Sequence, residues 1–429
     1  MIEDDIYRTS SQYRLWSFTE ESLRSVRQNT NRLASDRVRV ALRRAREARQ
    51  SANSSAAGTP NPNAGASDAD SKAGEEKDIE CLTPEEEQEL VRYYCEQIIQ
   101  LGESYKPPMP TIVRATAIQY LRRFYLTNSP MTYHPKTIMP CALFIATKTD
   151  NYYMSLRHFA DGVPGDTTAE DIIAPEFLVM QSLRFTFDVR HPFRGLEGGI
   201  MELNAIAQGL GQPAPHLPAQ TAEDLRRALP SLPPALNSPS STSSSSISDR
   251  LARAHHNTRE ILKSAAQMTD AYFLYTPSQI WLSALSIADE PLMQFYLNTK
   301  LPSPPETEPE NPTAHLRAKI LQTLTSCATL LQSYKPLASD PEQKKALRRI
   351  GKKLYHCQNP EKVNLAGQKR IPAAAAAAAS ASANPSETAT PDSEVERLAK
   401  KRKLEVEQQR AGDIFGGELV MERTKERQV

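Results

Sequence analysis

One motif occurs twice in this 429-residue chain, and its repetition narrows the possible folds more than any other feature. The segments that begin at Tyr133 and Tyr275 share the pattern Y-x-P-x-x-I-x-x-x-A-L-x-I-A, at a constant offset of 142 residues. Each copy predicts a helix with proline at its first position, behind a residue able to cap it. The small residues between the apolar ones let neighbouring helices approach closely, as is typical of the central helix of a bundle. The pattern indicates two similar helical units; the alternative is two unrelated amphipathic helices with similar starts.

The remaining ordered sequence also predicts helices, and the alternation typical of strands is absent. Thr83 as N-cap, Pro84 at the first helical position and the acidic residues that follow mark a strong helix start. Glu20 after Thr19 marks another. We therefore expect an all-α fold. Further helices are predicted at Pro110 to Leu126, Pro135 to Thr147, Ser155 to Asp161, Thr168 to Leu183, Pro192 to Leu210, Arg250 to Tyr272, Pro277 to Ala288, Pro291 to Asn298, His315 to Tyr334 and Pro341 to Tyr355.

Stretches rich in Ala, Ser, Pro, Asn and Gly separate the helical parts and are typical of disorder. The expected organisation is an N-terminal helical and basic extension at 1–50, a disordered linker at 51–80, a first helical unit at 81–190, a second unit at 191–335 with a disordered insertion at 211–249, a C-terminal helix at 336–358, and a low-complexity tail at 359–429 with a basic helix-prone segment.

Composition and missing motifs exclude several classes of protein. The five cysteines form no C-x-x-C pair, which argues against a zinc ribbon or redox motif and suits reduced thiols. We find no secretory signal and no apolar run of ~18 residues, so we expect no membrane association. No P-loop, nucleophile elbow, zinc-protease string or kinase signature occurs. We therefore expect no catalytic residue, no metal and no cofactor.

Four segments resemble the cyclin H family, whose members consist of two tandem cyclin folds, each a five-helix repeat. The resemblance is carried by Tyr120 to Lys148, Met268 to Ile280 with its string TDAYFLYTPSQI, Gln12 to Asn31, and Tyr105 to Pro110. It implies two cyclin folds flanked by N- and C-terminal helices and interrupted by disordered insertions.

The resemblance also implies a kinase-binding site made of Lys148, Glu176, Met180, Phe185 and Phe187. Cyclins contact a kinase through a lysine that ends the third helix and a glutamate on the fifth, and the first two residues match these positions. A helix-dipole role for the lysine and a surface position for the glutamate are the alternatives. For the aromatic residues and the methionine, the alternative is ordinary core packing.

Two residues near this site depart from the family pattern. The acidic pair that usually follows the lysine is Asp150-Asn151 here, so one charge is missing. Pro175 directly precedes the glutamate and would break a helix interior, so we expect the fifth helix to start near Ile172 with the proline in its first turn. Leu183, further along, we expect to be core.

Relatives of cyclin H bind and activate a cyclin-dependent kinase of the CDK-activating kinase complex. With a RING-finger assembly factor they form a heterotrimer within transcription factor IIH, which phosphorylates other kinases of the class and the RNA polymerase II C-terminal domain. The resemblance thus implies a nuclear kinase regulator with no direct nucleic-acid binding. The basic run Lys400, Lys401, Arg402 and Lys403 predicts a nuclear import signal, with a solvated helix face as the equal alternative.

A cyclin-fold transcription factor that binds DNA, resembling transcription factor IIB, is the main alternative function. That class normally carries an N-terminal zinc ribbon, which needs the C-x-x-C pairs missing here. Its DNA-facing surface should be basic, whereas Lys+Arg at 52 and Asp+Glu at 51 give this chain a net charge of +1. Charge and motifs therefore favour the kinase regulator.

Overall fold

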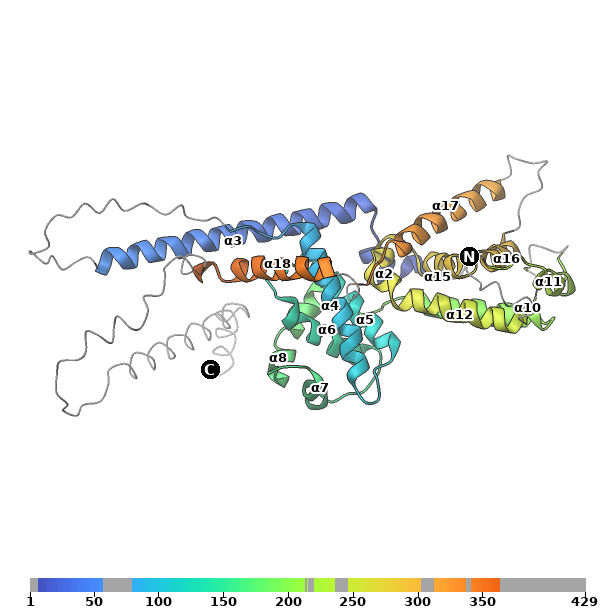
Figure 1. Cartoon of the computed structure of the whole chain (residues 1–429), viewed down its shortest axis with the longest axis horizontal. Helices are drawn as coiled ribbons and strands as arrows, with labels where there is room; N and C mark the ends of the chain where they lie inside the picture. The colour runs from blue at the N-terminus through green and yellow to red at the C-terminus, as the bar shows by residue number, and fades with distance from the viewer. Residues whose placement is uncertain are drawn as a thin grey trace, which may run out of the picture. The chain divides into compact units, whose positions relative to one another are not determined.

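The computed structural model describes residues 7–56, 79–212, 214, 220–235, 246–301, 312–336 and 341–362, all within one compact unit, Met1–Ala366. These residues form helices and connecting turns without any strand (Figure 1), so the all-α prediction is confirmed. None of the helices in these ranges combines the length and apolar character needed to cross a bilayer.

The first repeat surrounds the first copy of the sequence motif. It consists of α4 (Pro84–Ser104), α5 (Thr111–Thr127), α6 (Pro135–Thr149), α7 (Leu156–Gly162), α8 (Ala169–Ile173) and α9 (Glu176–Ser182). The predicted helix start at Thr83 is a capping box, because the Thr83 hydroxyl accepts from the Glu86 amide and the Glu86 carboxylate accepts from the Thr83 amide. Motif helix α6 packs against α4, α5, α8 and α9, and its Ala142 and Ala146 are fully buried. It is the central helix that the motif predicts.

The second repeat surrounds the second copy in the same way. It consists of α10 (Phe193–Ala207), α11 (Ala222–Ala228), α12 (Ile247–Lys263), α13 (Ala265–Met268), α14 (Ala271–Leu274), α15 (Pro277–Ala288), α16 (Glu290–Lys300) and α17 (Pro312–Gln332). Motif helix α15 packs against α10, α12, α16 and α17. The Trp281 ring of α15 lies so close to Gly195 and Gly199 of α10 that an added Cβ at either glycine would fall 2.6 Å from it. These glycines therefore let the two helices approach closely.

Two predicted helices are broken in the structure. Residues 168–183 form α8 and α9 with a corner at Ala174-Pro175, because the proline ring removes an amide donor and clashes with the preceding turn. The prediction placed Pro175 in the first turn of a helix that starts near Ile172. In the structure Pro175 is instead the N-cap of α9, which starts at Glu176. The prediction for 250–272 is also wrong, because Ser264 leaves helical geometry and a turn at Thr269-Asp270 ends α13.

Part of the stretch predicted as a disordered insertion, 211–249, is folded. Helix α11 starts with a capping box at Thr221, and Leu225 and Leu229 are buried in the core of the second repeat. The prediction is therefore wrong for this helix, because a composition-based assignment overlooks two apolar residues that one turn of helix can bury. The predicted linker at 51–80 is likewise wrong at its start, since α3 continues to Ala56. The rest of both stretches and the tail after residue 362 lie outside the described residues.

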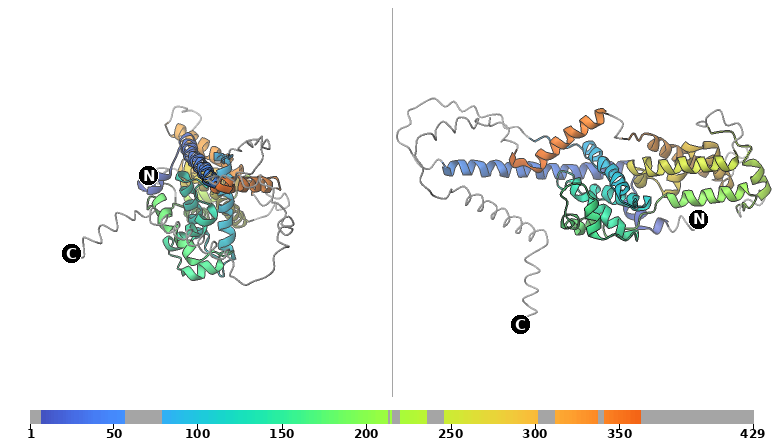
Figure 2. Two further views of the ribbon diagram at one scale, coloured as in Figure 1. Left: turned by 90° about the vertical axis from the view of Figure 1, so that its left-hand side faces the viewer. Right: turned by 60° about the horizontal axis from the view of Figure 1, so that its bottom comes forward.

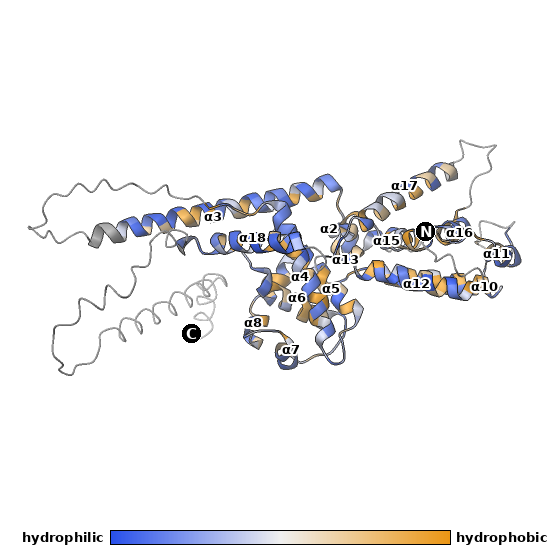
Figure 3. Cartoon of the chain, in the orientation of Figure 1, coloured by the Kyte–Doolittle hydropathy of each residue, from blue (hydrophilic) through white to orange (hydrophobic). Residues whose placement is uncertain are grey.

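Helices from both ends of the unit pack onto the first repeat. They are α2 (Ser11–Trp16), the 37-residue α3 (Glu20–Ala56), α18 (Pro341–Gln358) and the short η2 (Pro360–Lys362). Figures 1 and 2 show α3 as one long helix, and Figure 3 shows that polar residues predominate along it, whereas α5 and α6 carry more apolar residues. Ala34, Val38 and Leu42 of α3 share a buried cluster with Ile350 and Leu354 of α18.

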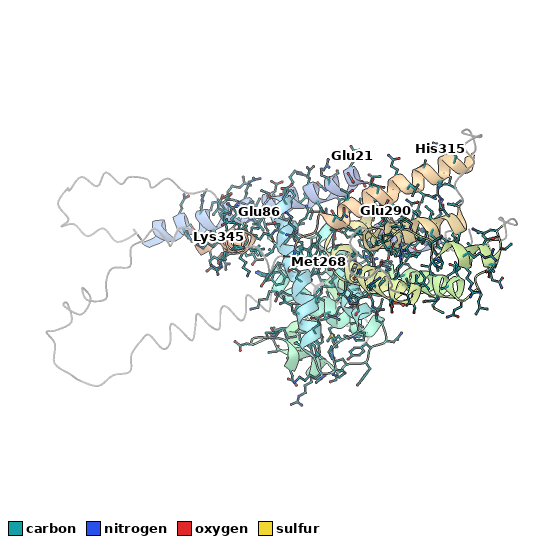
Figure 4. All side chains as sticks on the ribbon, turned by 45° about the vertical axis from the view of Figure 1, so that its right-hand side comes forward. Glu21, Glu86, Met268, Glu290, His315 and Lys345 are labelled. Atoms are coloured by element: carbon teal, nitrogen blue, oxygen red, sulfur yellow. The ribbon has the colours of Figure 1, made fainter. Side chains whose placement is uncertain are left out.

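A polar network joins the two repeats. Met268, labelled in Figure 4, lies where they meet, and its side chain is buried in the core of the first repeat. Beside it, Gln119 of α5 donates to Gln267 of α13 at 3.0 Å, and Gln267 donates to the Tyr272 hydroxyl at 2.7 Å. That hydroxyl lies 2.9 Å from Nδ1 of His191, whose Nε2 lies 3.0 Å from the Thr116 hydroxyl of α5. The neutral imidazole donates through one of these nitrogens and accepts through the other, and each hydroxyl can take the matching role.

Two arginines and one carboxylate form a second link. Arg27 of α3 binds both oxygens of Asp270 at 2.7 Å, and Arg122 of α5 binds one of them at 2.6 Å. A second Arg122 nitrogen donates to the Gln267 carbonyl. Burial by itself raises the pKa of Asp270, but the bonds from Arg27 and the charge of Arg122 outweigh it and lower that pKa. The N-terminal helix and both repeats thus converge on one carboxylate.

Acid is expected to destabilise the junction through His191. Burial, together with the charge of Arg123, lowers the pKa of His191 from 6.5 to about 3. The unfolded chain therefore binds a proton below pH 6.5 that the folded chain does not, and stability present above that pH is lost as the pH falls toward 3. The group contributes a slope approaching about 1.4 kcal/mol per pH unit.

Urea unfolding of the wild type and of His191→Gln at pH values from roughly 7 to roughly 4.5 measures this contribution. The variant should be less stable at neutral pH but should lose less free energy of unfolding on acidification. Parallel curves for the two proteins would contradict the assignment, and all other titrating groups cancel in the difference.

Candidate functional site

The structure brings Lys148 and Glu176 together at one end of the first repeat. Lys148 stands in the last turn of α6 and Glu176 is the first residue of α9, and the lysine ammonium donates to the glutamate carboxylate. The lysine nitrogen also lies 4.9 Å from the centre of the Phe144 ring. Since the lysine is at a helix C-terminus and the glutamate at a helix N-terminus, both charges complement the helix dipoles.

This ion pair is a surface feature. The side chain of Lys148 is 45% exposed and that of Glu176 is 21% exposed. Pairs with this exposure stabilise a fold by about 0–1 kcal/mol. Both groups can therefore exchange their mutual bond for bonds to a partner at little cost to the fold.

Two exposed aromatic rings lie on the same corner of the repeat. Phe177, next to Glu176 on α9, and Phe185, just after that helix, are each 55% exposed, and their ring centres are 6.1 Å apart. Ile173 at the end of α8 is also exposed. Sequence reasoning selected Phe185 and missed Phe177. The available signal was the apolar run from Ile172 to Met180, which contains more apolar residues than one helix face can bury.

A tight turn directs Phe185 outward. Arg184 and Phe185 both have φ of 53°, in the left-handed region that residues with a Cβ disfavour by about 1–2 kcal/mol each. The Phe185 amide donates to the Met180 carbonyl, and the Thr186 amide donates to the Leu183 carbonyl, so the turn is closed on both sides of the ring. Two strained residues in succession are typical of functional positions.

The other predicted contact residues lie partly in the core. Met180 and Phe187 are half-buried against the core of the first repeat, and the Phe187 carbonyl accepts a bond of 2.6 Å from the Tyr120 hydroxyl. Leu183 is fully buried, as expected for a core residue. Asp150, the retained acid after the lysine, is partly buried, and this burial raises its pKa. The predicted import signal at Lys400, Lys401, Arg402 and Lys403 lies outside the described residues.

Comparison with known proteins assigns each repeat separately. The family described as "Cyclin, N-terminal domain" matches residues 71–188, and the family described as "Cyclin C-terminal domain" matches residues 191–332. Fold and matches together define a cyclin with two cyclin folds, the first of which carries the surface described above.

Individual relatives show which kind of cyclin the chain resembles. Cyclin CCL1 of Saccharomyces cerevisiae is 32% identical over 301 residues, which cover 70% of this chain and 62% of that protein. Cyclin-H of Xenopus laevis is 28% identical over 302 residues, covering 68% of this chain and 78% of the relative. A chain in the structure of the CAK complex from Chaetomium thermophilum bound to ATP-γ-S is 31% identical, covers 91% of this chain and all of its own length, and superimposes with a TM-score of 0.60. The chain belongs to the cyclin H family. Its match spans somewhat less than two thirds of the length of the yeast relative.

Proposed function

We propose that this chain is the regulatory cyclin of a CDK-activating kinase complex, and that it activates a cyclin-dependent kinase without catalysing a reaction itself. The observation that carries the proposal is the corner of the first cyclin fold, where an exchangeable ion pair, Lys148–Glu176, lies beside the exposed rings of Phe177 and Phe185. Exposed aromatic side chains beside charged groups are the composition of protein interfaces. The names of the relatives, which include a CAK complex, support a kinase as the partner.

The mechanism follows from how such kinases are switched. The free kinase holds its C-helix rotated outward, so that its lysine–glutamate pair cannot form around ATP. A cyclin that binds only the inward position of that helix shifts the equilibrium by the difference in its binding free energy for the two states. In this proposal the aromatic pair packs on the helix, and the lysine and glutamate bond to its backbone or polar side chains.

The wider assembly is part of the same proposal. The expected partners are a kinase of the activating type, a RING-finger assembly factor and the core of transcription factor IIH, in a heterotrimer rather than a homo-oligomer. The expected substrates are other cyclin-dependent kinases and the RNA polymerase II C-terminal domain, and the expected location is the nucleus. The CAK complex among the similar structures supports the kinase. The assembly factor, transcription factor IIH, the substrates and the location follow from what membership of the cyclin H family implies.

Replacing both charged residues, Lys148→Ala with Glu176→Ala, should weaken kinase stimulation about tenfold or more, because partner bonds to charged groups are lost. The measurement is phosphorylation of a polymerase-tail peptide by the kinase, as a function of cyclin concentration. The fold should be unchanged, since the pair is exposed.

A matched control exists in the second repeat. Lys300 binds Glu202 there, and its nitrogen lies 5.5 Å above the Tyr296 ring, as Lys148 lies above Phe144. Lys300→Ala with Glu202→Ala should leave stimulation intact. If the wild type neither binds nor stimulates the kinase, even with the assembly factor added, the proposal is wrong. A gel shift with duplex DNA over a salt series would then test the DNA-binding alternative.

A further inference from the structure

Helix α2 packs against the segment that carries Phe185 and forms hydrogen bonds with it. Trp16 is buried, and its indole nitrogen donates to the Thr186 hydroxyl at 3.0 Å. Two guanidinium groups lie over its ring, with the Arg184 carbon 5.4 Å from the ring centre and the Arg123 carbon 5.1 Å from it. Trp16 therefore contacts the residues on both sides of Phe185 and none of the exposed ring itself.

Gln12, one turn before Trp16 on α2, binds the same segment four residues after Thr186, at Arg190. Its side-chain oxygen accepts from the Arg190 amide at 2.7 Å, and its side-chain nitrogen donates to the Arg190 carbonyl at 3.4 Å. One side chain thus pairs with both backbone groups of a residue, as a neighbouring strand would. The buried Arg123 of α5 also donates to this oxygen at 3.3 Å, which links Gln12 to α5.

The strained turn needs such support. Arg184 and Phe185 occupy left-handed geometry that residues other than glycine hold only when their surroundings impose it. The backbone bonds of the turn come from α9 and its C-cap, and Trp16 adds contacts to Arg184 and Thr186 from a different helix. Without that contact the turn is free to relax to a right-handed conformation, which would turn the Phe185 ring away from Phe177.

We propose that Trp16 and Gln12 are positioning residues, which hold the turn at Arg184–Thr186 so that Phe185 is presented to the kinase before the kinase arrives. The inference rests on the function proposed above. It gives the N-terminal segment a role in kinase affinity, although neither residue touches the kinase-facing surface. A merely structural role, in which α2 only covers the core, predicts no effect on affinity in a folded protein.

A double-mutant cycle on the bond between Trp16 and Thr186 tests the inference. Trp16→Phe keeps an aromatic ring and removes the donor, and Thr186→Val keeps the shape and removes the acceptor. Each should weaken binding of the full-length chain to the kinase about three- to tenfold, the equivalent of one lost hydrogen bond. The double variant should lose less than the sum of the two single losses, because both remove the bond between Trp16 and Thr186, while Thr186→Val also removes the bond from the Thr186 hydroxyl to the Leu183 carbonyl. Affinities within twofold of the wild type for both single variants would overturn the proposal.

Hydrogen exchange of the Phe185 and Thr186 amides supplies a second measurement that needs no kinase. Both amides should exchange faster in Trp16→Phe and Thr186→Val than in the wild type. Leu23→Ala is the matched control, since Leu23 shares the buried cluster of Trp16 but lies on α3 rather than on α2. It should lower the unfolding midpoint and leave both the exchange of these amides and the kinase affinity unchanged.

Failure of this inference differs from failure of the proposed function. If the wild type binds the kinase and Phe185→Ala weakens binding, the function stands, and the cycle alone decides the role of Trp16. If the wild type does not bind, the function is wrong and the proposed consequence for the kinase falls with it. Unchanged amide exchange in Trp16→Phe would overturn the positioning role in either case.

Discussion

Asp270→Ala should lower the free energy of unfolding by about 3 kcal/mol, because it leaves two largely buried arginines without their counter-ion. Arg27 and Arg122 are 15% and 10% exposed, and both bind this one carboxylate. The expected loss is at the lower end for a broken buried pair, since Asp270 itself is 25% exposed. Equilibrium denaturation in urea, followed by circular dichroism, measures it.

An exposed aspartate on α3, the helix that carries Arg27, provides the control. Asp36 pairs with Arg32 and Arg39 at the surface of α3, and Asp36→Ala should change stability by no more than about 0.5 kcal/mol. A loss below about 1 kcal/mol for Asp270→Ala would mean that water replaces the carboxylate at the two arginines. The junction would then not depend on this charge.

Removing the exposed aromatic pair, by Phe177→Ala with Phe185→Ala, should weaken kinase binding about a hundredfold or more. Central aromatic residues of an interface commonly contribute 2 kcal/mol or more each, as measured by truncation to alanine. The free energy of unfolding should change little, because more than half of each side chain already faces solvent. Titration of the kinase with each variant, and denaturation of the variants alone, separate the two effects.

Met201 of α10 is a suitable control for nonspecific loss of apolar surface. It is 72% exposed and belongs to the second repeat. Met201→Ala should bind the kinase as the wild type does. If the aromatic double variant also keeps its affinity, the kinase does not use this corner of the first repeat.

The sequence predicted those helices whose starts depend on residues close to one another in the chain. The caps at Thr83 and Thr276 are formed by residues three positions apart, and the twofold motif marked both central helices. Lys148 and Glu176 were selected through a family resemblance, and the structure shows them in contact. Their role in kinase binding remains a prediction.

Features that depend on distant residues were not predictable in this way. The break after α12 ends in a turn whose Asp270 binds Arg27, 243 positions earlier, and no local pattern reports such a partner. The periodicity of α9 placed Phe177 among apolar residues but could not tell which of them face solvent. The bond between Trp16 and Thr186 joins residues 170 positions apart, so the contact of α2 with the turn could not be predicted from a local pattern.

The cluster shared by α3 and α18 affects how the chain is made. Leu42 and Ile350 are packed in one cluster, yet 308 residues separate them in the sequence. At a synthesis rate of about 5–20 residues per second, the apolar face of α3 leaves the ribosome roughly 15–60 s before its partner helix exists. During that interval Ala34, Val38 and Leu42 can pack with the earlier residues of the cluster, such as Leu82 and Leu90, but lack the cover that α18 supplies. Completion of this cluster is therefore a late step of biosynthesis, and a nascent chain stalled before α18 would be a natural client for a chaperone.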